Sequence, residues 1–192
     1  PQVWSNYLDD LQLINNSPRY EMARERATLC QSAKGPVALM NHFARELQTT
    51  GYLHNHARMW FAGWWIHVER LPWQLGAHFF FKNLLDADPA SNTLSWRWVA
   101  GLQTPGKTYL PRRSNIEKYM SPDLLDTLQE GLEILERPTA VHPEAVERER
   151  ITHPGPDPET LPDNRNAGIW VHEEDLLPEA SPLSPLKPKA VL

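Results

Sequence analysis

Cysteine is almost absent from this chain of 192 residues, where Cys30 is the only one. A single cysteine excludes a disulfide framework and a zinc site built from cysteines, and it fits a reducing compartment, so we expect a cytoplasmic protein. Long apolar runs are also missing, because the most apolar stretch, Met59 to Val68, is too short to cross a bilayer. No signal peptide is visible. The chain begins at Pro1 instead of methionine, which favours a processed or truncated piece of a longer protein.

A strong excess of charge is missing from most of the chain. Residues 1–135 carry 13 Lys or Arg and 13 Asp or Glu, whereas residues 136–192 carry 6 and 11, which accounts for the net charge of −5. A neutral body lacks the basic surface that is typical of nucleic-acid-binding proteins, although Lys107, Arg112 and Arg113 form a small basic patch. This patch is either a solvated loop or a contact for the DNA backbone.

Apolar residues recur at helical spacing throughout the first 135 residues, and no pair of strand patterns is present. The spacing predicts helices over 4–14, 19–33, 36–50, 55–68, 73–85, 89–101, 114–119 and 121–135, with a loop over 103–113. The helix over 55–68 is apolar nearly all round, which is typical of an element at the centre of a core. The fold class is therefore all-α, a multi-helical bundle over residues 1–135.

Proline changes the character of the chain after Glu136, since ten of the 18 prolines fall in residues 136–192. Apolar periodicity ends there as well, so residues 136–192 are predicted to form an acidic, proline-rich, extended tail. One island in the tail, GIWVHEEDLL at 168–177, has enough apolar bulk to dock back on the body.

The stretch DADPASNTLSWRW at 86–98 places polar groups that are costly to bury among aromatic side chains. Proline at the first turn of a helix and aspartate at its N-cap are both favoured, so Pro89 and Asp88 mark a helix start. Asp88, Asn92 and Trp96 then form one stripe at intervals of four residues. Two tryptophans close the stretch, and six of the eight in the chain lie between residues 60 and 98.

A second polar line lies on the central helix, where Asn55, Arg58 and Met59 share a face. Because a buried carboxylate is costly unless it is paired, we expect Arg58 to pair with Asp86. An amide, two carboxylates and a guanidinium around an apolar slot suit a flat ring system with a polar edge. The alternative is that these groups are only helix caps and core ion pairs, with no ligand.

The blocks TGYLHNHARMW at 50–60 and LPWQLGAHFFFKNLLDADPASNTLSWRWVAG at 71–101 resemble, in order and spacing, the FAD-binding helical domain of the photolyase/cryptochrome family. The resemblance covers roughly residues 35–120 and implies FAD as the cofactor. It places Asn92 against flavin N5, Asp86 and Asp88 near the pyrimidine edge and ribityl chain, Arg58 as the partner of these acids, and Asn55 near the flavin and adenine.

The resemblance also implies roles for four side chains outside the flavin's polar edge. Trp96 and Trp73 match the first two members of a tryptophan chain that reduces photoexcited flavin, and Met59 and Trp98 match residues that face the DNA lesion. No third member of the electron chain is assigned, because Trp4 lies too far from the matched region. Three other tryptophans are expected to be plain core packing: Trp60, Trp64 and Trp65.

The sequence departs from the family pattern in several places. Ala87 stands where the family usually has glycine between the two aspartates. The Ser/Thr-rich loop that holds the FAD phosphates, the helix that meets the lesion and the α/β antenna domain are not in this sequence. The chain therefore resembles the C-terminal half of the family's domain. It is a fragment, one chain of a split protein whose partner supplies the phosphate loop, or a reduced descendant.

Three functions follow as hypotheses. The first is a photolyase-like flavoprotein, or part of one, that uses light to transfer an electron from reduced FAD to pyrimidine dimers in damaged DNA. Lyase activity would then depend on the missing upstream half. The second is a cryptochrome-like blue-light sensor that signals through the acidic tail. The third is a helical interaction or scaffold subunit that no longer binds flavin.

Two further patterns do not indicate a functional site. The Gly-Lys-Thr in TPGKTYL at 104–110 lacks the rest of a phosphate-binding loop and does not precede a long helix. His54 and His56 have metal-ligand spacing only on a strand; on a helix they point apart, and no third ligand is evident. We therefore expect no metal site and no membrane association.

Overall fold

The computed structural model describes residues 2–104 and 107–143, which contain helices and no strand. The described residues belong to one compact unit. The predicted tail, including the island at 168–177, lies outside the described residues from 144 onward. The division at residue 135 therefore stays a prediction, whereas the all-α class is confirmed for the described body.

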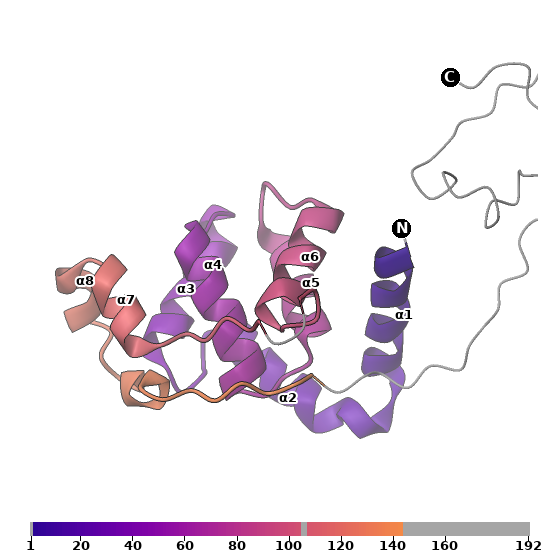
Figure 1. Cartoon of the computed structure of the whole chain (residues 1–192), viewed down its shortest axis with the longest axis horizontal. Helices are drawn as coiled ribbons and strands as arrows, with labels where there is room; N and C mark the ends of the chain where they lie inside the picture. Colours follow the sequence, from indigo (N-terminus) through magenta and orange to yellow (C-terminus); the bar gives the residue numbers. More distant parts are fainter. Residues whose placement is uncertain (1, 105–106, 144–192) are drawn as a thin grey trace, which may run out of the picture. The chain divides into compact units, whose positions relative to one another are not determined.

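The described body contains eight α-helices and three short helical turns (Figure 1). The α-helices are α1 (Gln2–Asn16), α2 (Glu21–Gln31), α3 (Ala38–Thr50), α4 (Asn55–Gly63), α5 (Trp73–Asn83), α6 (Pro89–Val99), α7 (Arg113–Tyr119) and α8 (Pro122–Asp126). The turns are the 3₁₀ turns η1 (Pro18–Tyr20) and η3 (Leu132–Leu135) and the π-helical turn η2 (Trp64–Val68). All but the last predicted helix agree with these bounds to within about two residues, as expected for frayed ends.

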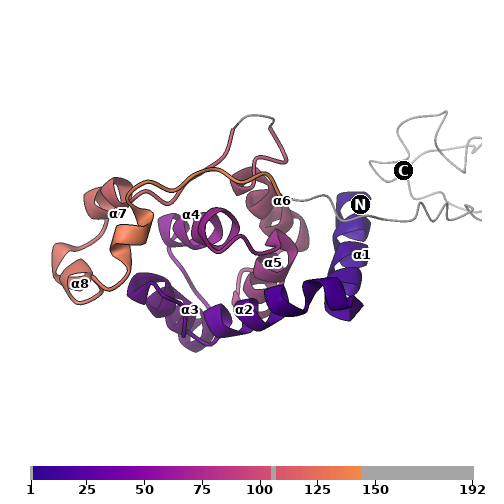
Figure 2. The same cartoon turned by 90° about the horizontal axis from the view of Figure 1, so that it is seen from below.

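Helix α4 and the π-helical turn that continues it lie at the centre of the core. They contact α3 on one side and α6 on another (Figure 2). Their aromatic side chains Trp60, Phe61, Trp64 and Trp65 are buried, which confirms core packing for the three tryptophans. Burial of several large aromatic rings supplies much of the hydrophobic stabilisation, so this mostly apolar helix forms the centre of the bundle.

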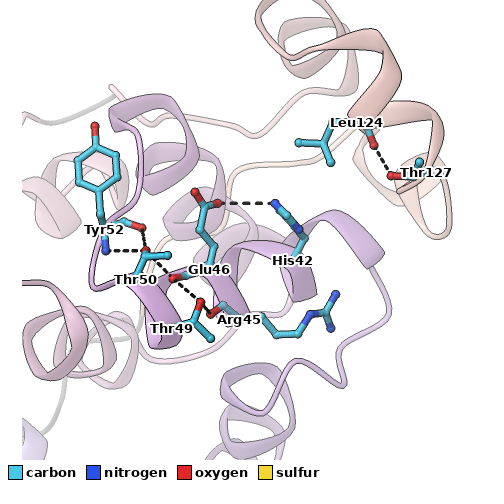
Figure 3. A network of polar contacts seen from close by, with 8 residues as sticks. All are labelled: His42, Arg45, Glu46, Thr49, Thr50, Tyr52, Leu124 and Thr127. Carbon is cyan, nitrogen blue, oxygen red and sulfur yellow. Dashed lines mark hydrogen bonds and ion pairs between the residues drawn. The ribbon is translucent and has the colours of Figure 1, made fainter.

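The turn after α3 sets the direction in which the chain enters α4. Gly51 ends α3 with φ of 69°, the left-handed conformation that glycine adopts without strain. The Thr50 hydroxyl donates to the Glu46 carbonyl oxygen at 2.7 Å and accepts from the Tyr52 N–H at 3.1 Å (Figure 3). Two residues on, Leu53 is buried. The turn thus anchors the start of the helix that carries part of the predicted site.

The predicted helix over 121–135 is wrong. Helix α8 ends at Asp126, and the chain turns at Gly131, with φ of 79°, into η3. Gly131 lies directly against the Pro36 carbonyl oxygen, and the Ala38 N–H donates to the Glu130 carbonyl oxygen at 2.9 Å. These contacts with the start of α3 require a bend, so the apolar stripe that suggested one helix instead buries Leu132 and Leu135.

The segment after η3 stays hydrogen-bonded to the body. The Val141 N–H donates to His67 Nδ1 at 3.2 Å, and His67 Nε2 lies 3.0 Å from the Val99 carbonyl oxygen. A nitrogen that accepts cannot carry a proton, so the neutral imidazole has its hydrogen on Nε2. Burial lowers the pKa of His67 below its ordinary value. His67 therefore joins the π-helical turn, the end of α6 and the C-terminal segment.

We expect the free energy of unfolding to fall as the pH is lowered below about 6.5, the ordinary pKa of histidine. The unfolded chain takes up a proton there, whereas buried His67 stays neutral, so the stability is full above this pH and decreases below it. Burial, with nearby Lys82, also lowers the pKa of His78 and acts in the same direction. The slope is at most about 1.4 kcal/mol per pH unit for each histidine.

Urea denaturation at several pH values measures this slope, and His67→Gln is the matched variant. A glutamine amide can donate to Val99 and accept from Val141 without titrating. The variant should therefore keep its stability at pH 8 and show a shallower slope below pH 6.5. An unchanged slope would show that His67 is not the titrating group.

Candidate functional site

A cavity of about 540 Å³ lies where α4, the end of α5 and α6 meet. Eight of the nine predicted site residues line it: Asn55, Arg58, Met59, Asp86, Asp88, Asn92, Trp96 and Trp98. Only Trp73 does not. The two polar lines predicted on separate helices thus face one common space, which is the arrangement that a bound ring system requires.

The cavity combines apolar walls with a polar rim. The walls include Ala62, Phe80, Leu84, Leu94 and Val99, none of which the sequence singled out. Polar lining comes also from Ser91, Ser95 and Gln103. The two serines could have been predicted from helical spacing, because they follow Asp88 by three and seven residues and share its face. Phe80 and Leu84 could not have been predicted, because an apolar residue in or next to α5 has the pattern of an ordinary core residue.

Arg58 and Asp86 form the predicted ion pair. Arg58 Nη2 donates to both carboxylate oxygens of Asp86 at 3.0 and 2.9 Å, and its Nε donates to the Leu53 carbonyl oxygen at 2.8 Å. The expected burial is wrong, since the Asp86 side chain is 58% exposed. An exposed pair of this kind contributes about 0–1 kcal/mol, so its role is to orient the two groups at the cavity rim.

Asp88 is the N-cap of α6, as predicted. Its carboxylate accepts from the Ser91 N–H at 2.7 Å. Hydrogen bonds from Ser91, first of all that backbone bond, lower the pKa of Asp88 below its usual range. Asp88 is exposed, again contrary to the expected burial. Both aspartates belong to the turn between α5 and α6, which lies at the mouth of the cavity and not beneath it.

Asn92 connects the two helices that flank the cavity. Its Nδ2 donates to the Ala77 carbonyl oxygen of α5 at 2.8 Å. Because the nitrogen is used in this way, the amide is held in one orientation and its Oδ1 is the atom offered to a partner in the cavity. Asn55 lines the cavity from α4, and its Nδ2 lies 3.6 Å from Met59 Sδ.

The aromatic lining consists of one buried and one exposed tryptophan. Trp96 is 2% exposed and packs edge-on against Phe80 and Trp65, with centroids 5.1 and 6.3 Å apart. Trp98 is 40% exposed and lies 5.9 Å from the ring of Tyr109. Trp96 therefore forms the floor of the cavity, whereas Trp98 is at its solvent side.

Trp73 belongs to a different cluster. Its ring lies 5.7 Å from Tyr7, which stacks on Trp4 at 5.1 Å, and the Arg97 guanidinium lies 5.9 Å above it. No ring contact between Trp73 and Trp96 occurs among the described residues. Trp4 could not be assigned from the sequence, because the contact that brings α1 against α5 has no local pattern.

The structure gives acidic partners to one residue of the predicted basic patch and a different arrangement to the two histidine rings. Arg113 is paired with Glu117 at 2.7 Å and with Glu136 at 3.4 Å, so it is not a free cation. The rings of His54 and His56 stack at 5.5 Å instead of pointing apart, because His54 precedes α4 as its N-cap.

The described residues contain neither a cluster of metal ligands nor a membrane-spanning helix. Among residues 2–104 and 107–143, no three histidine, cysteine, aspartate or glutamate side chains come together as metal ligands would. Within the same ranges, every helix is too short or too polar to serve as a membrane span.

Comparison with known proteins bears directly on this cavity. Residues 26–123 match the family described as the FAD binding domain of DNA photolyase, and all eight cavity residues named above lie in that range. Cryptochrome DASH of Idiomarina loihiensis is 31% identical over 106 residues, and deoxyribodipyrimidine photo-lyase of Streptomyces griseus is 33% identical over 104 residues. These alignments cover 55% and 53% of this chain.

A shorter stretch is more similar still, since 57 residues are 44% identical to deoxyribodipyrimidine photo-lyase of Agrobacterium fabrum, covering 30% of this chain and 12% of that protein. The chain spans only 23% and 21% of the length of the Idiomarina and Streptomyces relatives. No solved structure matches it significantly. With the family match extending over half of its residues, the chain belongs to the photolyase/cryptochrome family, through the FAD-binding domain.

Proposed function

We propose that the cavity between α4, α5 and α6 holds the flavin ring of FAD, and that this chain takes part in light-driven electron transfer to pyrimidine dimers in DNA. The observation that carries the proposal is the convergence of eight predicted site residues on one cavity of about 540 Å³. Small-molecule sites usually have such a volume, mostly apolar walls and a few placed polar groups.

The residues present fit a flavin ring. Apolar side chains such as Phe80 and Met59 suit its flat faces, and Asn92, Asp86 and Asp88 suit its hydrogen-bonding edge. Asn92 supports the fit most directly, because its amide is fixed by Ala77 and presents an acceptor oxygen to a ring N–H. When bound, reduced FAD supplies the excited-state electron for dimer cleavage.

Trp96 and the Trp73 cluster support the electron-transfer part of the proposal. Trp96 is a buried indole in the cavity wall, and edge contacts with Trp65 and Phe80 hold its ring in place. Trp73, Tyr7 and Trp4 form a second row of rings on the neighbouring helices α5 and α1. We propose that these indoles carry electrons toward the cavity.

Damaged DNA is the partner we favour over a purely sensory role, although the relatives carry both photo-lyase and cryptochrome names. Trp98 is exposed at the cavity mouth beside Tyr109, where an indole face can stack on a base. Arg112 and Lys107 are exposed on the loop that follows α6 and can contact DNA phosphates.

Among the described residues, the cavity lining lacks a free cation that could bind the FAD pyrophosphate. FAD carries a pyrophosphate, but Arg58 is the one cation in the cavity lining, and it is already paired with Asp86. Leu85, next to Asp86 in the chain, is 88% exposed. We propose that an upstream segment or a partner chain covers the cavity rim and binds the phosphates.

Titration of the purified chain with FAD, followed by flavin fluorescence, tests the proposal. We expect saturable binding, weakened about tenfold in Asn92→Ala because a hydrogen bond to a polar ring is lost. Asn15→Ala, on an exposed position of α1, is the control and should bind as the native chain does. A native chain that takes up no FAD, or that binds FAD equally after Asn92→Ala, would defeat the proposal for this chain on its own.

A further inference from the structure

A second cavity, of about 420 Å³, lies on another side of the described body. The end of α1, the η1 turn, the segment after the π-helical turn and residues 141–143 surround it. Its walls include the apolar side chains Ile14, Tyr20, Ile66 and Leu71. It shares no lining residue with the cavity described above, so the two sites are separate.

Arg70 is the unusual residue of this cavity. Its φ is 55°, the left-handed region where glycine is normally found and where other residues are strained. The turn itself is complete without the side chain, because the Leu71 N–H donates to the Trp65 carbonyl oxygen at 3.0 Å. A glycine would adopt this conformation at lower cost, so the turn does not explain why an arginine is present.

The Arg70 side chain is exposed and lines the cavity. No acidic side chain among the described residues forms an ion pair with it. The nearby Glu69 pairs with Arg26 instead, at 2.6 Å. A guanidinium that is held over an apolar cavity at the expense of backbone strain is well placed to bind an anion from outside the chain.

The other polar groups agree with an anionic ligand. Arg19 and His142 also line the cavity, and the Arg19 guanidinium lies 5.8 Å from the ring of Tyr20. No lining residue carries a carboxylate. The Asp10 carboxylate does not line the cavity, and it accepts a hydrogen bond from Gln74 Nε2 at 2.9 Å.

We propose that this cavity binds a small organic anion, an aromatic ring that carries one carboxylate or phosphate group, with Arg70 as the residue that pairs with the charge. Tyr20 and the aliphatic walls would contact the ring. This site does not depend on the proposed flavin function, because the first cavity contributes none of its residues.

Nuclear magnetic resonance of the ¹⁵N-labelled full chain tests the proposal with benzoate as the probe and neutral benzamide as its isostere. We expect benzoate to shift the Arg70 Nε–H and Gln74 side-chain signals with a Kd of about 1 mM, typical of a fragment of this size. Benzamide should bind at least about tenfold more weakly, because it lacks the charge that pairs with the guanidinium.

Arg70→Gly is the decisive variant, and Ala33→Gly is its matched control. Ala33 also has a left-handed backbone, with φ of 56°, but it does not line the cavity. Arg70→Gly should lose benzoate binding at least tenfold while its Tm rises by about 3 °C, since the strain is relieved. Ala33→Gly should bind benzoate as the native chain does.

Four results would overturn the proposal. Equal binding of benzoate and benzamide would remove the role of charge, and undiminished binding by Arg70→Gly would remove the role of this residue. Benzoate shifts confined to the side-chain amides of Asn55 and Asn92 would place the anion in the first cavity. A lower Tm for Arg70→Gly would show that the side chain supports the fold itself.

Discussion

Replacing Gly76 with alanine is expected to disrupt the aromatic wall of the proposed flavin cavity. An added Cβ would overlap the six-membered ring of Trp96 and approach Trp65 Cε2 at 3.1 Å. Both rings are buried, so neither can move into solvent. Overpacking of this kind costs about 1–3 kcal/mol, more than the roughly 1 kcal/mol that alanine gains over glycine in a helix. The shifted Trp96 ring would also narrow the cavity.

Thermal denaturation and near-ultraviolet circular dichroism measure the two consequences of Gly76→Ala. We expect a lower Tm and an altered tryptophan signal, together with reduced FAD uptake. Gly35→Ala is the control, because its Cβ would meet Trp64 Cζ2 at 3.2 Å, a contact that a small movement relieves. An unchanged Tm and tryptophan spectrum for Gly76→Ala would mean that the Trp96 ring does not lie against α5.

Gly131→Ala is expected to be the most destabilising single methyl addition in the described body. The new Cβ would overlap the Pro36 carbonyl oxygen and lie 3.0 Å from Val37 Cα, both of them backbone atoms at the start of α3. Gly131 also has φ of 79°, which costs alanine about 1–2 kcal/mol by itself. We expect a loss of about 3 kcal/mol or more in the free energy of unfolding.

Urea denaturation of Gly131→Ala and of the control Gly51→Ala separates the steric overlap from the cost of the left-handed backbone. Gly51 has a similar φ of 69°, but its Cβ would meet mainly the side chain of Leu85, which is exposed and can rotate away. The free energy of unfolding of Gly51→Ala should therefore fall only by the cost of the left-handed backbone, about 1–2 kcal/mol. Equal losses for the two variants would show that the contact between Gly131 and Pro36 does not hold η3 against α3.

Local chemistry explains why most of the helices could be predicted from the sequence. Asp88 and Pro89 mark the start of α6, Gly51 marks the end of α3, and the apolar run at 55–68 marks the central helix. Each of these signals acts over a few residues, so no knowledge of the packing is needed to read it. The last predicted helix was wrong because the chain turns at Gly131, which lies against the Pro36 carbonyl oxygen almost a hundred residues earlier in the chain.

The site was predictable to the extent that its residues share helix faces. Spacing placed Asp88, Asn92 and Trp96 on one stripe and Arg58 beside Met59 on another, and the structure brings both to one cavity. Spacing could not show that Asp86 and Asp88 lie at an exposed rim, because exposure depends on which elements cover the turn. It also could not show that Trp73 faces α1 instead of Trp96.

Most of the helices, the residues that share their faces and the family of the chain can be inferred from the amino-acid sequence. The packing of the helices is needed to know which rings touch, where the aspartates meet water and how Arg70 comes to line a second cavity. The reason is physical: helical periodicity arises from bonds between neighbours along the chain. Burial and cavities, in contrast, arise from contacts between helices, which cannot be predicted from the pattern of residues close together in the sequence.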